Sequence, residues 1–277
     1  AKNFISKINL KSYNINLSTT SRKKTSREIF DGVNYKNFQF DSEIYDKDLI
    51  LKLREADYIL ISIPPKKGED LVIKNFSKFL EISKVKWVTY LSATSVYGDH
   101  KGEWVNENSK TNPTSPNGLA RLKAENSWLS LKKNKNLPVQ IFRLAGIYSN
   151  EKNVLTRLKL GTAKLINKKN HFFSRIHVED IANILFESLF KFRSGEIYNL
   201  ADDKPSSSEE IMLYGAKILN IQNLTKIQVN EIESEMLKNF YKDSKKVSNK
   251  KMKSFFKYNL KFPTYVEGLN YIRNNFF

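Results

Sequence analysis

The chain alternates short apolar runs with stretches of helical periodicity, and this alternation limits the folds open to it. The apolar runs predict strands at residues 13–19, 35–40, 57–63, 86–91, 139–144 and 197–200. Helical patterns lie at residues 46–55, 69–83 and 118–133, and a serine run followed by Glu209 and Glu210 predicts a capped helix ending near Leu219. The run 57–63 is apolar almost throughout, as expected for a strand buried on both faces. The pattern therefore predicts an α/β protein with a parallel sheet.

Composition excludes several other classes of protein. The chain has 277 residues, of which 40% are hydrophobic, and this is enough to bury a substantial core. It has no apolar run near the ~18 residues of a membrane span, no visible signal peptide and no cysteine, which together predict a cytoplasmic protein without disulfides. The net charge is +18, but the lysines are dispersed along the chain, so a nucleic-acid partner is not expected. A positive field would instead attract an anionic cofactor or substrate.

Two motifs carry a resemblance to a known family. The run 91–99 reads Leu-Ser-Ala-Thr-Ser-Val-Tyr-Gly-Asp, and the run 119–125 reads Leu-Ala-Arg-Leu-Lys-Ala-Glu. Together they resemble the catalytic half of an extended short-chain dehydrogenase/reductase, the group that holds nucleotide-sugar epimerases and dehydratases. Further blocks at 142–148, 174–180 and 244–269 extend the resemblance to the end of the chain. It implies a Rossmann-type, doubly wound parallel sheet (core at 1–148 and 176–200) with a small C-terminal substrate lobe (149–175 and 201–277).

The start of the chain departs from that pattern. Residues 1–11 predict a helix, and the first strand and the Gly-x-Gly-x-x-Gly turn that would precede it are absent from the sequence. We therefore expect the chain to be an N-terminally shortened version of a longer gene product. The strands predicted near residues 13–17 and 58–63 should then flank a gap without pairing directly. The alternative, that another segment fills the gap, stays open.

The resemblance also locates the catalytic positions, and two of them have changed. In the family a Ser or Thr stands at the position of Ala93, and the acid/base Tyr stands at the position of Leu119, four residues before Lys123. Leucine can neither give nor take a proton. The candidate catalytic residues are therefore Lys123, which keeps its position, and the neighbouring hydroxyls of Ser92 and Thr94. The segment 112–118 with Arg121 resembles an atypical subgroup of the family that also lacks this tyrosine.

The candidate cofactor is NADP, with NAD as the alternative. Thr20, Ser21 and Arg22 follow a predicted strand where an acidic residue would mark NAD, and an arginine there suits the 2′-phosphate of NADP. The competing reading is an exposed basic turn. The resemblance places the remaining cofactor residues at Ile63, Pro64, Pro65, Ser92, Lys123, Leu144 and Ala145, and the substrate residues at Gly146, Ile147 and Arg175. With three histidines and no cysteine, we expect no metal site.

Two functions fit these observations. The first is an NAD(P)-binding epimerase/dehydratase-like protein or oxidoreductase that acts on a nucleotide-linked sugar or a related polar substrate with a degenerate catalytic set. The second is a catalytically inactive dinucleotide-binding or regulatory module, which the loss of two groups that act as a unit favours. A homodimer is compatible with either.

Overall fold

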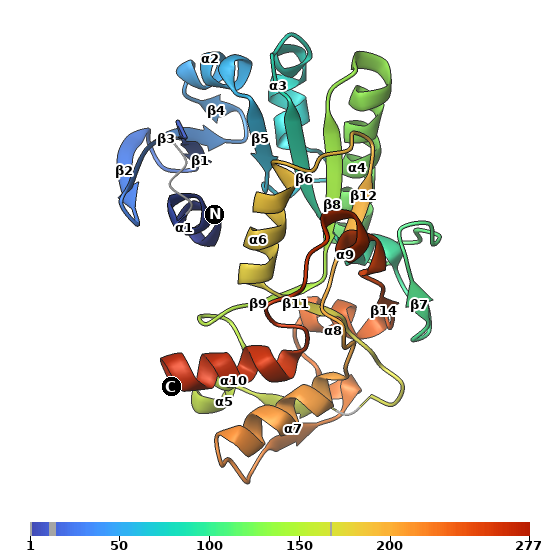
Figure 1. Ribbon diagram of the computed structural model, residues 1–277. Coiled ribbons are helices and arrows are strands. Elements are labelled where there is room, and N and C mark those ends of the chain that lie inside the picture. Colours follow the sequence, from blue (N-terminus) through green and yellow to red (C-terminus); the bar gives the residue numbers. More distant parts are fainter. Residues whose placement is uncertain (1, 11–14, 167) are drawn as a thin grey trace. The chain divides into compact units, whose positions relative to one another are not determined.

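The computed structural model describes residues 2–10, 15–166 and 168–277 (Figure 1). They divide into two compact units, each built from three segments of the chain. The first unit contains residues 1–92, 123–141 and 182–197, and the second contains 93–122, 142–181 and 198–277. The functional division into a Rossmann core and a substrate lobe stays a prediction.

The N-terminal part of the first unit is a helix followed by a small mixed sheet. Its elements are α1 (Lys2–Leu10), β1 (Ser18–Ser21), β2 (Ser26–Phe30), β3 (Val33–Asp41) and β4 (Ile44–Tyr45). Strand β3 is central, with β1 parallel to it and β2 and β4 antiparallel. The β2–β3 turn is made by Asp31 and Gly32, both with positive φ, as tight hairpins require.

Two of the three elements predicted for this region are confirmed, and the third is displaced. The helix near residues 1–11 and the strand near 35–40 are present as α1 and β3. The strand predicted at 13–19 is wrong in its position. Residues 13 and 14 lie outside the described residues, 15–17 are not extended into a strand, and β1 begins at Ser18. The strand begins at Ser18 because its pairing with β3 begins there, opposite Lys36.

The main sheet carries the alternating pattern of the sequence. Strands β5 (Tyr58–Ile61), β6 (Trp87–Ala93), β8 (Val139–Leu144) and β12 (Ile197–Leu200) lie in the order β5-β6-β8-β12, and β5 and β6 are parallel. Helix α2 (Asp48–Glu55) precedes β5, and the helices between the strands include α3 (Leu71–Glu81), α4 (Pro116–Lys135) and α6 (Val178–Ser188). The predicted α/β class with a Rossmann-like parallel sheet is confirmed.

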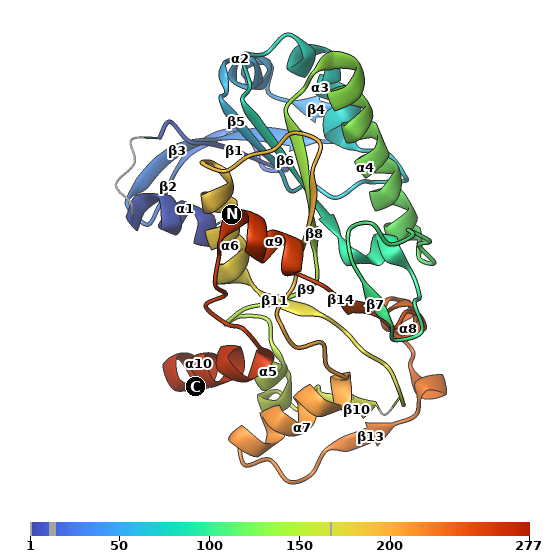
Figure 2. The same ribbon diagram turned by 45° about the vertical axis from the view of Figure 1, so that its right-hand side comes forward.

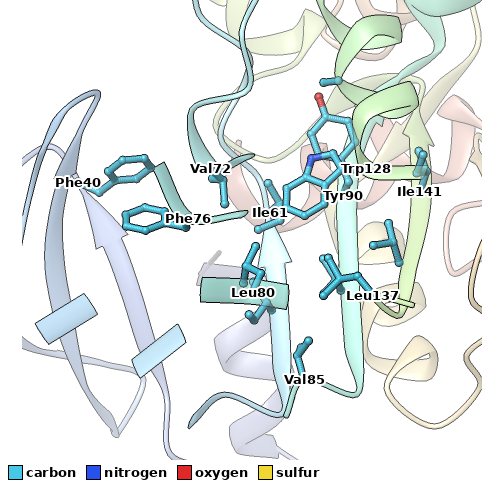
Figure 3. Packing of buried hydrophobic residues seen from close by; sticks show 14 of the residues in the cluster. Phe40, Ile61, Val72, Phe76, Leu80, Val85, Tyr90, Trp128, Leu137 and Ile141 are labelled. Atoms are coloured by element: carbon cyan, nitrogen blue, oxygen red, sulfur yellow. The ribbon is translucent and has the colours of Figure 1, made fainter. Parts of the chain in front are cut away.

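The core of the first unit lies between its strands and helices α3 and α4. Figure 3 shows Phe76 and Leu80 of α3 and Trp128 of α4 packed against the strands. The ring of Trp128 lies 6.2 Å from that of Tyr90, and its indole N–H donates to a carboxylate oxygen of Asp70 at 3.0 Å. The other oxygen of Asp70 caps α3. One carboxylate therefore joins the start of α3 to α4.

Strands β1 and β5 belong to different sheets within the described residues. Strand β1 pairs with β3, β5 pairs with β6, and no pairing among the described strands joins β1 to β5. The expected missing strand stays a prediction.

The second unit contains three short parallel strand pairs and several helices (Figure 2). The pairs are β9 (Gly146–Tyr148) with β11 (Arg175–His177), β10 (Lys164–Ile166) with β13 (Thr225–Ile227), and β7 (Trp104–Val105) with β14 (Lys246–Val247). The helical elements are η1 (Thr94–Tyr97), α5 (Val154–Lys159), α7 (Ser208–Ile218), η2 (Val229–Glu231), α8 (Glu235–Lys242), α9 (Lys250–Phe256) and α10 (Tyr265–Phe276). None of the described helices is long and apolar enough to span a bilayer.

Helix α7 begins where the serine run predicted it. The hydroxyl of Ser207 accepts a hydrogen bond from the backbone N–H of Glu210 at 2.9 Å, which is the first half of the expected capping box. The carboxylate of Glu210 instead accepts from the hydroxyl of Tyr265 and pairs with Lys204. The N-terminal turn of α7 is thereby tied to α10.

Candidate functional site

The predicted hydroxyl residues lie at the end of β6. The side chain of Ser92 is 2% exposed, and its oxygen has no hydrogen-bond partner among the described residues. Ala93 ends the strand and Thr94 opens η1, and both are partly exposed. Of the two candidate hydroxyl residues, therefore, Thr94 is the one with accessible surface.

The start of α4 packs directly against η1. A Cβ atom on Gly118 would lie 2.7 Å from the carbonyl oxygen of Ser95, so the two backbones approach as closely as a glycine permits. The Ser115 hydroxyl accepts from the N–H of Gly118 at 3.1 Å and holds the first turn in place. Leu119 stands in that turn and is 56% exposed. Lys123 follows one turn later in the same helix and is exposed.

A second close backbone approach fixes the loop that leads to α4. Gly98 has a φ of 70° and a ψ of −152°, a conformation that is essentially restricted to glycine. A Cβ atom there would lie 1.8 Å from the carbonyl oxygen of Asn112, and the two residues form a parallel bridge. Gly98 and Gly118 therefore hold the segment 112–118 against the end of η1.

Tyr97 has a structural role. Its side chain is fully buried, and its hydroxyl donates to Asn199 Oδ1 at 2.7 Å. The guanidinium of Arg143 lies 4.8 Å from the ring centroid. Burial raises the pKa of Tyr97 above its ordinary value, against the opposing effect of the Arg143 charge. A buried phenol whose proton is committed to Asn199 cannot take the place of the missing tyrosine.

Arg175 is brought next to the other predicted substrate residues. Strand β11 pairs with β9 so that Arg175 lies opposite Gly146, and Gly146 and Ile147 are exposed. The Nη1 atom of Arg175 donates to the carbonyl oxygens of Phe173 and Ser206 at 3.2 and 3.1 Å. Burial lowers the pKa of Arg175 to about 10, so the guanidinium remains charged at neutral pH. The side chain is thus a fixed, partly exposed cation on the strand that pairs with the exposed residues Gly146 and Ile147.

Asp202 is a buried carboxyl that the sequence did not single out. It is 2% exposed, and its carboxyl oxygens make no well-aligned hydrogen bond among the described residues, although the backbone N–H groups of Arg175 and Lys204 lie close enough to stabilise its charged form. Burial raises the pKa of Asp202 to about 8, although the charge of Arg175 opposes the rise. Its backbone N–H donates to the Arg175 carbonyl at 2.6 Å. The available signal was its position, because polar residues directly after a buried strand lie at the functional edge of a parallel sheet.

The predicted cofactor residues lie at two strand ends of the first unit. Thr20 and Ser21 were expected to follow a strand, but they form its last two residues, and only Arg22 follows β1. The displaced start of β1 explains this difference. Arg22 is exposed, whereas the Ser21 hydroxyl accepts hydrogen bonds from the side-chain amide of Asn37 and the N–H of Lys23. Residues 63–65 follow the end of β5 after one intervening residue.

The other predicted cofactor residues are largely covered. Leu144 ends β8 and Ala145 follows it, and both are buried. The N–H of Ala145 donates to the carbonyl of Leu200 at 3.0 Å, which continues the pairing of β8 with β12. Exposure therefore begins at Gly146, at the first of the predicted substrate residues.

A pocket of about 380 Å³ lies within the second unit, and none of the predicted site residues lines it. We call it the Trp104 pocket, after the tryptophan in its wall. Its walls come from β7, β14, the start of α9 and the segment after β12, among them Trp104, Asp202, Asp203, Val247, Asn249 and Lys253. Among the described residues, no three His, Asp or Glu side chains are grouped to hold a metal ion.

Comparison with known proteins identifies similar chains. A model of the NAD dependent epimerase/dehydratase family matches residues 72–201. A conserved protein of unknown function from Silicibacter pomeroyi DSS is 30% identical, with a TM-score of 0.86 over 98% of this chain and 94% of that one.

More distant solved structures share the fold. UDP-N-acetylglucosamine 4-epimerase from Bacillus cereus is 15% identical, with a TM-score of 0.75 over 98% of this chain and 93% of that one. dTDP-glucose 4,6-dehydratase from Bacillus anthracis str. Ames, solved with NAD, is 18% identical, with a TM-score of 0.73 over 98% and 91%. A search of curated proteins gave no match.

Proposed function

Because the chain belongs to the NAD-dependent epimerase/dehydratase family, we propose that it binds NAD(P) together with a nucleotide-linked sugar or a related polar substrate, and that its acid/base chemistry does not use the family's tyrosine. The observation that carries the proposal is the packing of α4 on η1. The glycine contact at Gly118 keeps the helix start against the hydroxyl-bearing turn, while Leu119 stands exposed where the tyrosine would be. The backbone frame of the site is retained, but leucine stands at the position of the proton donor.

The residues present fit the two ligands. Bound NAD(P) would supply the site with a hydride acceptor or donor. Lys123 would hold the cofactor ribose, and Arg22 would contact the adenosine phosphate, because an exposed guanidinium at a strand end can pair with it in two-pronged fashion. Arg175, fixed by two main-chain carbonyls, would bind the substrate's diphosphate beside Gly146 and Ile147. Enzymes with a similar fold are named for UDP- and dTDP-linked sugars, which supports this substrate class.

Cofactor choice gives the first test. Replacing Arg22 with alanine is expected to weaken NADPH binding by about 10- to 100-fold, because a charge-assisted contact contributes roughly 1.5–3 kcal/mol. NADH binding should not change. Fluorescence titration of both reduced cofactors measures the ratio of affinities, with Lys24→Ala as the control at a nearby exposed cation. Equal affinity of the wild type for the two cofactors would contradict the NADP assignment.

The second candidate function is a dinucleotide-binding module without turnover. It is favoured by Leu119 and Ala93, since neither can exchange a proton, and by the commitment of the Tyr97 hydroxyl to Asn199. The two functions differ in one observable. An enzyme reduces or oxidises its bound cofactor when a panel of UDP- and dTDP-linked sugars is added, and a module leaves the cofactor unchanged.

Restoring the two lost groups tests the catalytic frame. The double variant Leu119→Tyr with Ala93→Ser is expected to turn over a nucleotide-linked sugar more than about tenfold faster than the parent, since Tyr, Ser and Lys act as a unit with large non-additive effects. Leu119 is exposed, so a tyrosine fits there without repacking. The matched control is Leu119→Phe with Ala93→Ser, which supplies the ring without the hydroxyl. Equal activities of the tyrosine and phenylalanine variants would show that this site differs in geometry from the family's.

A further inference from the structure

We propose that the Trp104 pocket is a second small-molecule site, which binds a pyranose ring through an aromatic wall and a facing set of polar groups. Its volume of about 380 Å³ falls within the range of roughly 300–1,000 Å³ typical of small-molecule sites. Its lining includes Trp104, Asp203 and Asn249, so an apolar surface and hydrogen-bonding groups meet in one hollow. The proposal does not depend on the nucleotide-sugar site at Arg175.

The backbone that carries the aromatic wall is fixed by strand pairing, and the aromatic side chain itself is exposed. Trp104 is 56% exposed, whereas large aromatic side chains are usually covered. Figures 1 and 2 show β7 beside β14, and the pairing places Trp104 opposite Lys246 and Val105 opposite Val247. Backbone hydrogen bonds from Lys246 to Glu103 and from Ser248 to Val105 fix the strand. The C–H face of a pyranose is apolar with a partial positive charge, and it complements the electron-rich face of an indole.

The polar wall is preorganised by its own contacts. The two carboxylate oxygens of Asp203 lie 3.0 and 2.9 Å from Nζ of Lys253. The side-chain amide of Asn249 donates to Asp203 and to the carbonyl of Ala201 at 2.7 and 2.9 Å. Asp203 remains partly accessible and keeps acceptor capacity. A carboxylate next to an ammonium suits neighbouring hydroxyls of a sugar, one of which donates to the carboxylate while the other accepts from the ammonium.

Asp202 also lines the pocket, but its carboxyl is covered. The residue is 2% exposed, its carboxyl oxygens have almost no accessible surface, and the nearby backbone N–H groups of Lys204 and Arg175 and the charge of Arg175 act on them. The groups that a ligand can reach on the polar wall are therefore those of Asp203, Asn249 and Lys253.

Tryptophan fluorescence provides the direct test. The sequence has three tryptophans, and Trp87 and Trp128 are both buried, so Trp104 is the one whose emission a surface ligand changes. Titration with D-glucose and with N-acetylglucosamine is expected to give a saturable emission change. Asp203→Asn, which keeps the reporter, should weaken the response at least tenfold, whereas Glu151→Gln at an exposed carboxylate should not. Absence of a saturable change with either sugar would overturn the proposal.

A second measurement detects binding without tryptophan fluorescence. It also shows whether the bound sugar is free or part of a nucleotide-linked ligand. Ligand-observed NMR should detect glucose bound to the wild type and not to Trp104→Ala, a change at an exposed position. Binding of UDP alone should be the same in both proteins. If UDP-glucose binds Trp104→Ala more weakly than it binds the wild type, the pocket holds the sugar of a nucleotide-linked ligand. If free glucose binds the wild type without a nucleotide, the pocket holds a free sugar. Unchanged glucose binding in Trp104→Ala would refute the site, and Arg175→Ala, which tests the proposed function, should leave glucose binding intact.

Discussion

Gly98→Ala is expected to lower the free energy of unfolding by about 2–6 kcal/mol. Two costs add: backbone strain of about 1–3 kcal/mol, because the conformation of Gly98 is essentially restricted to glycine, and overpacking of about 1–3 kcal/mol. The overpacking follows from the Asn112 carbonyl oxygen, 1.8 Å from the position of the new Cβ. Urea denaturation followed by circular dichroism measures the loss.

The matched control for this variant is Gly68→Ala. Gly68 also has a positive φ of 78°, but a Cβ there would meet nothing within 4 Å, so only the strain remains, at about 1–2 kcal/mol. The difference between the two variants isolates the close approach of Asn112. If the two lose the same stability, the segment 112–118 is not held against Gly98 in the way described.

Asp202→Asn is expected to remove a large pH dependence of stability. Burial raises the folded-state pKa of Asp202 to about 8, while an unfolded aspartate titrates near 4. A raised pKa means that the folded state binds the proton more tightly, so this stability is present below about pH 4 and is lost as the pH rises toward 8. Relative to the variant, the unfolding free energy of the wild type should fall by up to about 1.4 kcal/mol per pH unit across that window. The nearby charge of Arg175 lowers the folded-state pKa of Asp202 and so limits the width of this window, not the slope within it.

Urea denaturation at a series of pH values between 4.5 and 8.5 measures this slope for both proteins. The control is Glu151→Gln, which removes an exposed carboxylate and keeps Asp202 and its neighbours, so it should retain the wild-type slope. Parallel curves for the wild type and Asp202→Asn would show that Asp202 is ionised throughout and that its burial costs little.

The sequence predicted the main sheet well because apolar runs report burial directly. The strands 139–144 and 197–200 match β8 and β12 at both ends, and the helices at 69–83 and 118–133 appear as α3 and α4 with slightly shifted ends. The strand at 13–19 failed because a polar, weakly patterned segment becomes a strand only beside a partner, here β3. The hairpin β2–β3 was not predicted, although Asp31-Gly32 is a standard signal for such a turn.

The sequence by itself determined the fold class and the family, and it predicted the positions at which the family's tyrosine and serine are missing, since these depend on residue types at fixed spacings. Tertiary structure decided what each polar group can do. It buried the Ser92 and Tyr97 hydroxyls, placed Arg175 opposite Gly146, and enclosed the carboxyl of Asp202. It also gathered Trp104, Asp203 and Asn249 around one pocket from segments about 50 to 150 residues apart along the chain. Burial and such long-range contacts set the pKa and the hydrogen-bond partners of a side chain, and no local pattern of residues encodes them.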